Sequence, residues 1–392
     1  MGRAHLFLIA AVLFLARALA FDAPYPEGHR TRINGYTVLH LAGNGKKMGE
    51  RHAHLAGRLV RQVLRDVILE GEGSGSRYDS LIRGAMVMER YLPDEYRAEL
   101  KALAAGCDVK YQDIVALQLF GDVQRGQRCT SFATFGDATA SGECIVGRNM
   151  DFWDHGASKY AAMIIHYTPD EGIPFMTVTW AGIINGWTAM NHRGIVCANN
   201  SAYGGRDSIE GLSTCFMVRK VAQFARTVEE GVRIVQHTQR ACGTNLLIAG
   251  GNPPKAAIVE FDHERVAVRW AKNGFVAAAN EFRALGRNYD SRLEDLGGES
   301  ARGKVGNDLF GGYYWISRDE LLVKLIRQHY GRIDESTNLV GAEGVPIRSI
   351  NLHSALLFPD RLAFRVSMSE VPAADQPYRR YRMTDRGIVS DE

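Results

Sequence analysis

A cysteine and two charged residues that follow it closely are the residues best suited to covalent chemistry. Cys129 opens the run Cys-Thr-Ser-Phe after Arg128, and Arg148 and Asp151 lie in the run Gly-Arg-Asn-Met-Asp-Phe at 147–152. If the bond before Cys129 were cut, its thiol would be a nucleophile and its freed amine a base. A terminal amine has a pKa of about 7.7–8.0, close enough to neutrality to take a thiol proton. This arrangement needs no distant histidine.

Arg148 and Asp151 supply the charges that such a centre needs. A guanidinium beside the sulfur stabilises the thiolate, and a carboxylate anchors the ammonium group. Side chains three residues apart do not project alike from a flat strand. We therefore expect a strand end or a bend at Asn149–Met150.

Other interpretations of these residues stay open. Cys129 could be a buried structural thiol, the commonest state of an isolated cysteine. His353 could activate a thiol, as in Cys/His proteases. However, a lone histidine on an alternating strand is more often a core residue, and no cysteine here has the papain-type Cys-Gly-Ser-Cys-Trp context.

The elements that would position these residues are mainly helices before Gly126 and mainly strands after it. A strand is predicted at 36–42 and helices at about 47–69, 93–105 and 111–119. Strand blocks that alternate with helices fit an α+β layered architecture, with sheets inside and helices outside. The further strands are predicted at 129–135, 144–148, 160–167, 174–180, 184–190, 194–199, 244–249, 256–261, 265–270, 275–279, 351–358 and 362–367, and the further helices at 214–240 and 318–330.

The first twenty residues are typical of a secretory signal. Arg3 precedes an apolar run at 6–15, and Ala18-Leu19-Ala20 forms a small-x-small cleavage site. We expect export to a secreted, periplasmic or lumenal location; an uncleaved anchor is the alternative. No later stretch is apolar enough to predict a membrane span.

The charge and cysteine content narrow the class of protein. The 47 Lys and Arg residues against 44 Asp and Glu leave a net charge of +3, too balanced to predict a nucleic-acid surface. Six cysteines in an exported protein normally suggest disulfides. If Cys129 is kept free, at least one other is unpaired, and we expect most of them to be small buried side chains.

Five short motifs carry a resemblance to a known family. They are Arg-Cys-Thr-Ser-Phe at 128–132, Gly-Arg-Asn-Met-Asp-Phe at 147–152, Met-Asn-His-Arg-Gly-Ile at 190–195, Thr-Asn-Leu-Leu-Ile-Ala at 244–249 and Leu-His-Ser-Ala-Leu-Leu-Phe-Pro at 352–359. In this order they resemble the acyl-coenzyme A:isopenicillin N acyltransferase-like autoproteolytic hydrolases. These are cysteine-type N-terminal nucleophile hydrolases, related to bile salt hydrolases and acid ceramidase.

The resemblance implies a four-layer αββα fold and a precursor that cuts its own backbone between Arg128 and Cys129. Residues 1–20 would be the signal peptide, residues 21–128 a mainly helical light chain that stays bound, and residues 129–392 the heavy chain in the same αββα domain. Arg128 is a departure, because several relatives have a smaller residue before the cut.

The resemblance also implies roles for site residues. Cys129 would be the nucleophile, with Arg148 and Asp151 holding its thiol and amine. Asn200, nine residues after Asn191, and Asn280 would be oxyanion donors, although Asn200 could equally hold a strand end. Asn280 departs from the family because Glu281-Phe282 follows it in place of the usual histidine. Arg318 would be the last family arginine, with Arg292 as a rival.

The expected function is hydrolysis of linear amide bonds through a thioester acyl-enzyme. The alternatives are transfer of the acyl group, for example from acyl-coenzyme A, to an amine acceptor, and an inactive binding protein on the same fold. We expect no cofactor, no metal and no nucleic-acid partner; the partners would be a small acyl amide and the chain's own light chain. Apolar acyl groups are expected because aromatic residues flank the motifs: Phe132, Phe152, Trp153, Trp180 and Trp187.

Overall fold

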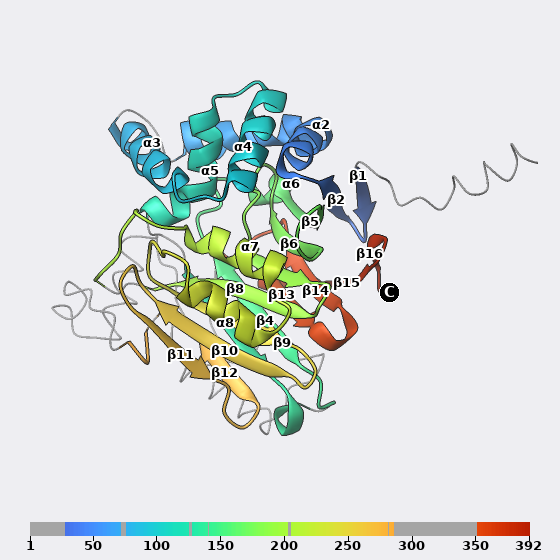
Figure 1. Cartoon of the computed structure of the whole chain (residues 1–392). Helices are drawn as coiled ribbons and strands as arrows, with labels where there is room; N and C mark the ends of the chain where they lie inside the picture. Colours follow the sequence, from blue (N-terminus) through green and yellow to red (C-terminus); the bar gives the residue numbers. More distant parts are fainter. Residues whose placement is uncertain are drawn as a thin grey trace, which may run out of the picture.

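Two β-sheets form the centre of the molecule, and helices lie against one of them (Figure 1). The structure is a computed structural model, and it describes residues 28–71, 76–124, 128–139, 141–202, 205–280, 282–285 and 351–392. Apolar side chains of both sheets meet in one buried cluster, which includes Val38 and Ile164 of one sheet and Val146 and Leu357 of the other. The two sheets are therefore stacked face to face.

The larger sheet has the strand order β1-β2-β5-β6-β7-β8-β9-β10-β11 in the described residues. β2 and β5 pair in parallel, and the other neighbours pair antiparallel. The parallel pair joins a strand that precedes Cys129 to one that follows it. The strands are β1 (His29–Ile33), β2 (Tyr36–Gly43), β5 (Ala162–Pro169), β6 (Phe175–Trp180), β7 (Thr188–Asn191), β8 (Ile195–Ser201), β9 (Thr244–Gly250), β10 (Lys255–Phe261) and β11 (Val266–Trp270).

The smaller sheet has the order β12-β3-β4-β13-β14-β15-β16, with antiparallel pairing throughout. Its central strands β3, β4 and β13 carry the sequence motifs around Cys129, Arg148 and His353. The strands are β3 (Arg128–Thr134), β4 (Ile145–Asp151), β12 (Phe275–Ala278), β13 (Asn351–Phe358), β14 (Ala363–Met368), β15 (Arg379–Thr384) and β16 (Gly387–Ser390).

The helices pack in two groups (Figure 1). α2 packs on α4 and α3 on α5, whereas α7 packs on β7 and β8, and α8 on β9 and β10, which covers the outer face of the larger sheet. Asn44 caps α2, because its side chain accepts a hydrogen bond from the Lys47 N–H at 3.1 Å. The elements are α2 (Gly45–Val63), the π-helix η1 (Leu64–Leu69), α3 (Ser76–Glu89), α4 (Asp94–Cys107), α5 (Tyr111–Gln124), α6 (Ser158–Ala161), α7 (Thr214–Phe224), α8 (Val228–Gln236), and the 3₁₀ turns η2 (Gly136–Ala138), η3 (Pro359–Arg361) and η4 (Ala373–Asp375).

The prediction of one long helix at 214–240 is wrong, because the chain forms α7 and α8 with a break between them. Ala225 is extended and ends α7, and Thr227 starts α8 by accepting a hydrogen bond from the Glu230 N–H at 3.2 Å. A threonine followed three residues later by a glutamate is a helix-start signal inside an apolar pattern that otherwise looks continuous. The sequence analysis also did not predict α3, β1, β15 or β16.

The α+β class is confirmed. The described residues supply a helix layer and two stacked sheets, and the helix predicted at 318–330 lies outside them, as do residues 1–20 and Gly126. All six cysteines are buried and free, which confirms the expectation that most are small buried side chains. No described helix is long and apolar enough to cross a membrane.

Candidate active site

Cys129 lies near the start of β3, where strand pairing determines its neighbours. It stands opposite Met150 on β4, which in turn stands opposite His353 on β13. Directly opposed residues of antiparallel strands share a face, and residues two apart along a strand share it too. Ala133 on β3 belongs to the buried cluster between the sheets. The Cys129 side chain, which is fully buried, therefore faces the space between the sheets.

The thiol is placed in an environment of opposing charges. Burial raises the pKa of Cys129, and the Asp151 carboxylate adds to this rise. The Arg148 guanidinium lowers the pKa through its charge and a hydrogen bond, and a hydrogen bond from the Asp151 backbone lowers it as well. The net pKa is above its ordinary value. The thiol of the uncut chain is therefore held in its neutral form near pH 7.

Arg148 is buried beside the thiol with part of its guanidinium unpaired. Its Nη1 donates to the Asn149 carbonyl at 2.5 Å and to Asn200 Oδ1 at 3.3 Å. Its Nε and Nη2 have no hydrogen-bond partner in the described part of the chain. A buried unpaired donor costs free energy unless an acceptor arrives. These two groups are thus suited to a thiolate or an oxyanion that forms during a reaction.

Asp151 ends β4, and its carboxylate is buried beneath β13. Asn351 Nδ2 donates to Asp151 Oδ1 at 3.0 Å. β4 runs unbroken through Asn149–Met150, so the strand end or bend predicted there is wrong. The irregularity lies in the neighbouring strand, where the register shifts between Asn351 and His353. This bulge in β13 places Asn351 opposite Asp151.

Asn200, on β8 of the larger sheet, and Asn280, which follows β12 of the smaller sheet, meet at β3. Asn280 Oδ1 accepts the Cys129 N–H at 3.1 Å, while its Nδ2 donates to the Ser201 carbonyl at 2.6 Å. Asn200 Nδ2 donates to Ser131 Oγ at 2.6 Å and to the Ala278 carbonyl at 3.3 Å. Backbone carbonyls only accept and backbone N–H groups only donate, which defines both amide orientations. In the uncut chain both NH₂ groups are engaged, and the predicted oxyanion roles stay predictions.

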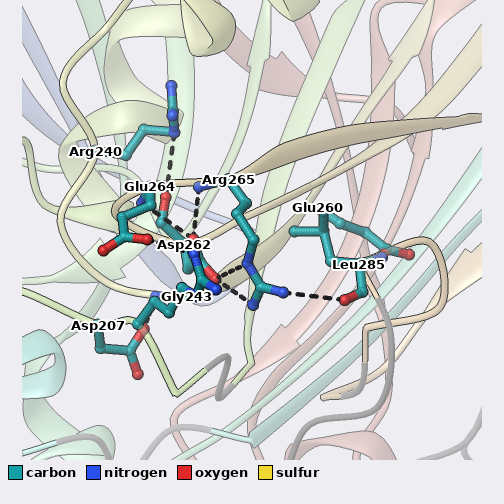
Figure 2. A network of polar contacts seen from close by, with 9 residues as sticks. Asp207, Arg240, Gly243, Glu260, Asp262, Glu264, Arg265 and Leu285 are labelled. Carbon is teal, nitrogen blue, oxygen red and sulfur yellow. Dashed lines mark hydrogen bonds and ion pairs between the residues drawn. The ribbon is translucent and has the colours of Figure 1, made fainter.

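A polar network anchors the chain immediately after Asn280 (Figure 2). The buried Glu260 carboxylate on β10 pairs with Arg269 Nε at 2.5 Å. Its Oε2 also accepts the backbone N–H groups of residues 283–285 at 2.7–3.0 Å. Arg265, held by Asp262, donates to the Leu285 carbonyl at 3.2 Å. This network fixes the segment that follows β12, and with it Asn280.

Aromatic and imidazole side chains lie along the space between the two sheets, which Cys129 faces. Trp180 and Trp187 meet edge to face at 5.3 Å between centroids, and Trp187 stacks on His353. His353 Nε2 lies 2.8 Å from Thr188 Oγ1, and burial together with Arg148 lowers its pKa well below the ordinary value. His353 is thus a neutral, satisfied core residue, in agreement with the sequence interpretation.

Phe132 cannot line a pocket at the thiol, because it lies on the opposite face of the smaller sheet. Strand alternation places it there, and it packs in a separate cluster with Ile145, Leu356 and Phe358. Phe152 is buried against Phe120 of α5 at 5.1 Å between centroids, and Trp153 is partly buried beside the helix-side core. The two rival arginines, Arg318 and Arg292, lie outside the described residues.

The structure brings together five of the six predicted site residues: Cys129, Arg148, Asp151, Asn200 and Asn280. Sequence reasoning missed Ser131, which accepts from Asn200, and Asn351. Ser131 lies in the recognised motif two residues after Cys129, so strand alternation could have indicated it. Asn351 depends on a bulge that the sequence does not reveal. Among the described residues, no group of three or more His, Cys, Asp or Glu side chains could hold a metal ion.

Part of this chain matches the model of a known family. Residues 138–299 match the family described as acyl-coenzyme A:6-aminopenicillanic acid acyl-transferase. The match confirms the resemblance to the acyltransferase family found in the sequence, and it covers less than half of the chain. The matched segment contains Arg148, Asp151, Asn200 and Asn280, and it begins nine residues after Cys129.

The curated relatives match only part of this chain. An uncharacterized protein of Archaeoglobus fulgidus is 25% identical over 280 residues, which covers 62% of this chain and 47% of that protein. Protein dcd1A of Dictyostelium discoideum is 24% identical over 197 residues, covering 47% of this chain and 44% of that protein. The chain thus spans about half the length of the curated relatives it matches.

Two solved structures are similar to parts of this chain. A Caenorhabditis elegans N-acylethanolamine-hydrolyzing acid amidase ortholog is 15% identical, covers 63% of this chain and 96% of that one, and has a TM-score of 0.41. A penicillin V acylase from Agrobacterium tumefaciens is 13% identical, with coverages of 62% and 83% and a TM-score of 0.37. Similarity at this level defines neither the site nor the substrate of this chain.

Proposed function

We propose that this chain is an exported, self-cleaving cysteine amidohydrolase that acts on linear amide bonds through a thioester acyl-enzyme. The supporting observation is the convergence, at a cysteine that opens a central strand, of a buried arginine, a buried carboxylate and two side-chain amides. Every one of these groups has a place in the chemistry of a terminal cysteine. The signal-like segment at 1–20 supports export.

The maturation step begins with the Cys129 sulfur, which attacks the Arg128 carbonyl carbon. A C–S bond forms, the C–N bond breaks, and the thiol proton passes to the leaving nitrogen, which becomes the α-amine of Cys129. Water then hydrolyses the thioester and restores the thiol. Asn280 Oδ1 already accepts the N–H of the scissile bond. It would keep that nitrogen in place as the bond breaks.

Contacts across the cut support a light chain that stays bound. Glu99 of α4 pairs with Arg219 of α7 at 2.6 Å, with both side chains fully buried. Asp122 of α5 accepts from the Thr214 N–H at 3.0 Å and from its hydroxyl at 2.6 Å. Removing one partner of a buried pair costs about 3–5 kcal/mol. Separation of the two segments would break all of these contacts at once.

In turnover, the Cys129 amine would take the thiol proton, and the thiolate would attack the substrate carbonyl. The leaving amine departs with that proton, and water releases the acyl group from the thioester. The unpaired Arg148 Nε and Nη2 are donors available to the developing negative charge. One such donor contributes roughly 2.7–4 kcal/mol where it has been measured.

Acyl transfer is the second candidate function, favoured by the description of the family that residues 138–299 match. It uses the same residues and differs in the final step, where an amine acceptor replaces water. Trp180, Trp187 and Phe152 are buried near the site and support an apolar acyl group. Each buried methylene contributes about 0.8 kcal/mol, or roughly fourfold in kcat/KM.

A panel of N-acyl amides of increasing chain length tests the proposal. We expect kcat/KM to rise severalfold per added carbon until the pocket is full, and no turnover by the Cys129→Ala variant. A flat or falling dependence on length would refute the apolar pocket. If product forms only when an amine acceptor is added, the enzyme is a transferase and not a hydrolase. An acylating thiol probe that leaves Cys129 unlabelled would support an inactive binding protein instead.

A further inference from the structure

Asn351 contacts the site but had no role in the sequence analysis. It is buried at the start of β13, and its Nδ2 donates to Asp151 Oδ1 at 3.0 Å and to the Met150 carbonyl at 3.3 Å. Its Oδ1 accepts the Ala374 N–H at 2.9 Å. Since a carbonyl only accepts and an N–H only donates, the amide has one possible orientation. Its NH₂ group faces the Asp151 carboxylate.

The β13 bulge brings this amide into place. The register shifts between Asn351 and His353, so that Asn351 stands opposite Asp151. Bulges of this kind redirect a side chain next to a functional site. A buried carboxylate is costly unless it accepts hydrogen bonds, and a bond to a charged acceptor is stronger than a neutral one. The Asn351 amide therefore holds the Asp151 carboxylate in one orientation.

We infer that Asn351 is a positioning residue that holds the Asp151 carboxylate ready for the ammonium group of Cys129. The inference rests on the proposed function. During the cut the leaving nitrogen takes the thiol proton, so that it is an ammonium group in the tetrahedral intermediate before the C–N bond breaks. A carboxylate oriented in advance meets this ammonium without reorganising, which is how a fixed dipole or charge lowers a barrier. Asn351 acts on the reaction through Asp151 and does not touch the reacting atoms.

The isosteric variant Asn351→Asp distinguishes this role from simple packing. A new carboxyl group at this place would face Asp151 Oδ1, and two adjacent carboxylates cannot both ionise at low cost. While the two carboxyl groups share one proton, the new group can donate a hydrogen bond to Asp151 as the amide does. Once this proton is lost, the two carboxylates repel each other. The other titratable groups here, within the described residues, are Cys129 on β3, Arg148 on β4 and His353 on β13.

The test is the rate of self-cleavage at Arg128–Cys129 against pH, followed by intact mass. In the wild-type chain the rate should rise with pH, because burial raises the pKa of the Cys129 thiol. The Asn351→Asp chain should cleave itself at acidic pH. Above neutral pH, its cleavage rate should be at least tenfold lower than that of the wild-type chain. Asn185→Asp is the matched control, because Asn185 is also buried and donates to a backbone carbonyl, that of Gln118, at 2.8 Å.

The outcomes separate the inference from the proposed function. If wild type cleaves and Asn351→Asp follows the same pH profile, Asn351 does not position Asp151. The same conclusion holds if Asn185→Asp shows the identical loss above neutrality, because buried charge alone would explain it. If wild type is cut at no pH, the proposed function fails and the inference falls with it.

Discussion

At the scale of single residues, the two unpaired nitrogens of Arg148 are the clearest indication that the site binds a negative charge that forms during the reaction. We predict that Arg148→Ala lowers kcat/KM by roughly 10²–10³-fold, the usual loss when one preorganised donor is removed. Asp151→Asn should lower it comparably, because the charge that holds the Cys129 ammonium group is lost. Steady-state kinetics on the best acyl amide would show this. Lys272→Ala, an exposed change, is the control. Maturation and near-normal rates in both site variants would mean that the site is wrongly assigned.

Gly147 shows how closely the sheet is packed behind the site. A Cβ atom at this position would lie 1.7 Å from the Phe132 ring. We predict that Gly147→Ala lowers the free energy of unfolding by about 1–3 kcal/mol, the usual cost of overpacking, and that Phe132→Leu in the same chain restores part of it. Gly57→Ala is the control, since its Cβ would meet Cys107 Sγ at an ordinary 3.5 Å. Urea unfolding measures all four chains; equal stability of Gly147→Ala and wild type would contradict the packing.

Residue spacing could predict part of this site and not the rest. Cys129, Arg148 and Asp151 lie in short motifs on adjacent strands, so their proximity follows from a hairpin. Asn280 follows β12, which pairs with β3 in the same sheet, whereas Asn200 on β8 reaches β3 only because the two sheets stack. Asn351 requires a bulge as well. The engaged NH₂ groups of both asparagines depend on three-dimensional neighbours and could not be read from the sequence.

At the scale of elements, Glu260 anchors the segment after β12 and so positions Asn280. We predict that Glu260→Ala costs about 3–5 kcal/mol of unfolding free energy, because Arg269 loses a buried carboxylate partner and three backbone N–H groups lose their acceptor. Glu264→Ala should cost about 1 kcal/mol or less, because the Glu264–Arg206 pair is more than half exposed. Chemical denaturation tests both, and similar losses in the two variants would contradict the anchor.

Element boundaries were predictable where the apolar pattern was strong and ended at a turn residue. β2, α4, β9 and β10 lie within a few residues of their predicted ranges. α3 was missed because only Leu81, Gly84, Ala85 and Met88 are buried on it, which is a weak stripe. The arginine-rich β15 was missed because four of its six residues are polar and charge gives no strand signal.

At the scale of the whole molecule, a row of histidines joins strands from both sides of the proposed cut. His29 stacks on His40 at 4.1 Å, and His166 Nε2 lies 3.0 Å from His192 Nε2. Burial is the main cause that lowers the pKa of His40 to about 4 and of His166 to about 3. Asp385 acts in the opposite direction on His192.

These shifts predict loss of stability in acid. An unfolded histidine has a pKa near 6.5, so between that pH and the folded values the unfolded state binds more protons, and stability falls as pH falls. The contribution of His166 is fully present above about pH 6.5 and is lost progressively down to about pH 3. We predict that Tm drops over this range in wild type and drops less in His166→Gln. An equal drop in both would exclude the histidine row as the cause.

The central claim is that Cys129 becomes an N-terminus, and N-terminal sequencing with intact-mass analysis of the purified protein tests it most directly. We predict two chains that remain associated, with the heavy chain beginning at Cys129, and one uncut chain for Cys129→Ala. The heavy chain should be absent from the variant even after long incubation, since the nucleophile of the cut is missing. A fully active enzyme that consists of one unbroken chain through Arg128–Cys129 would contradict the account.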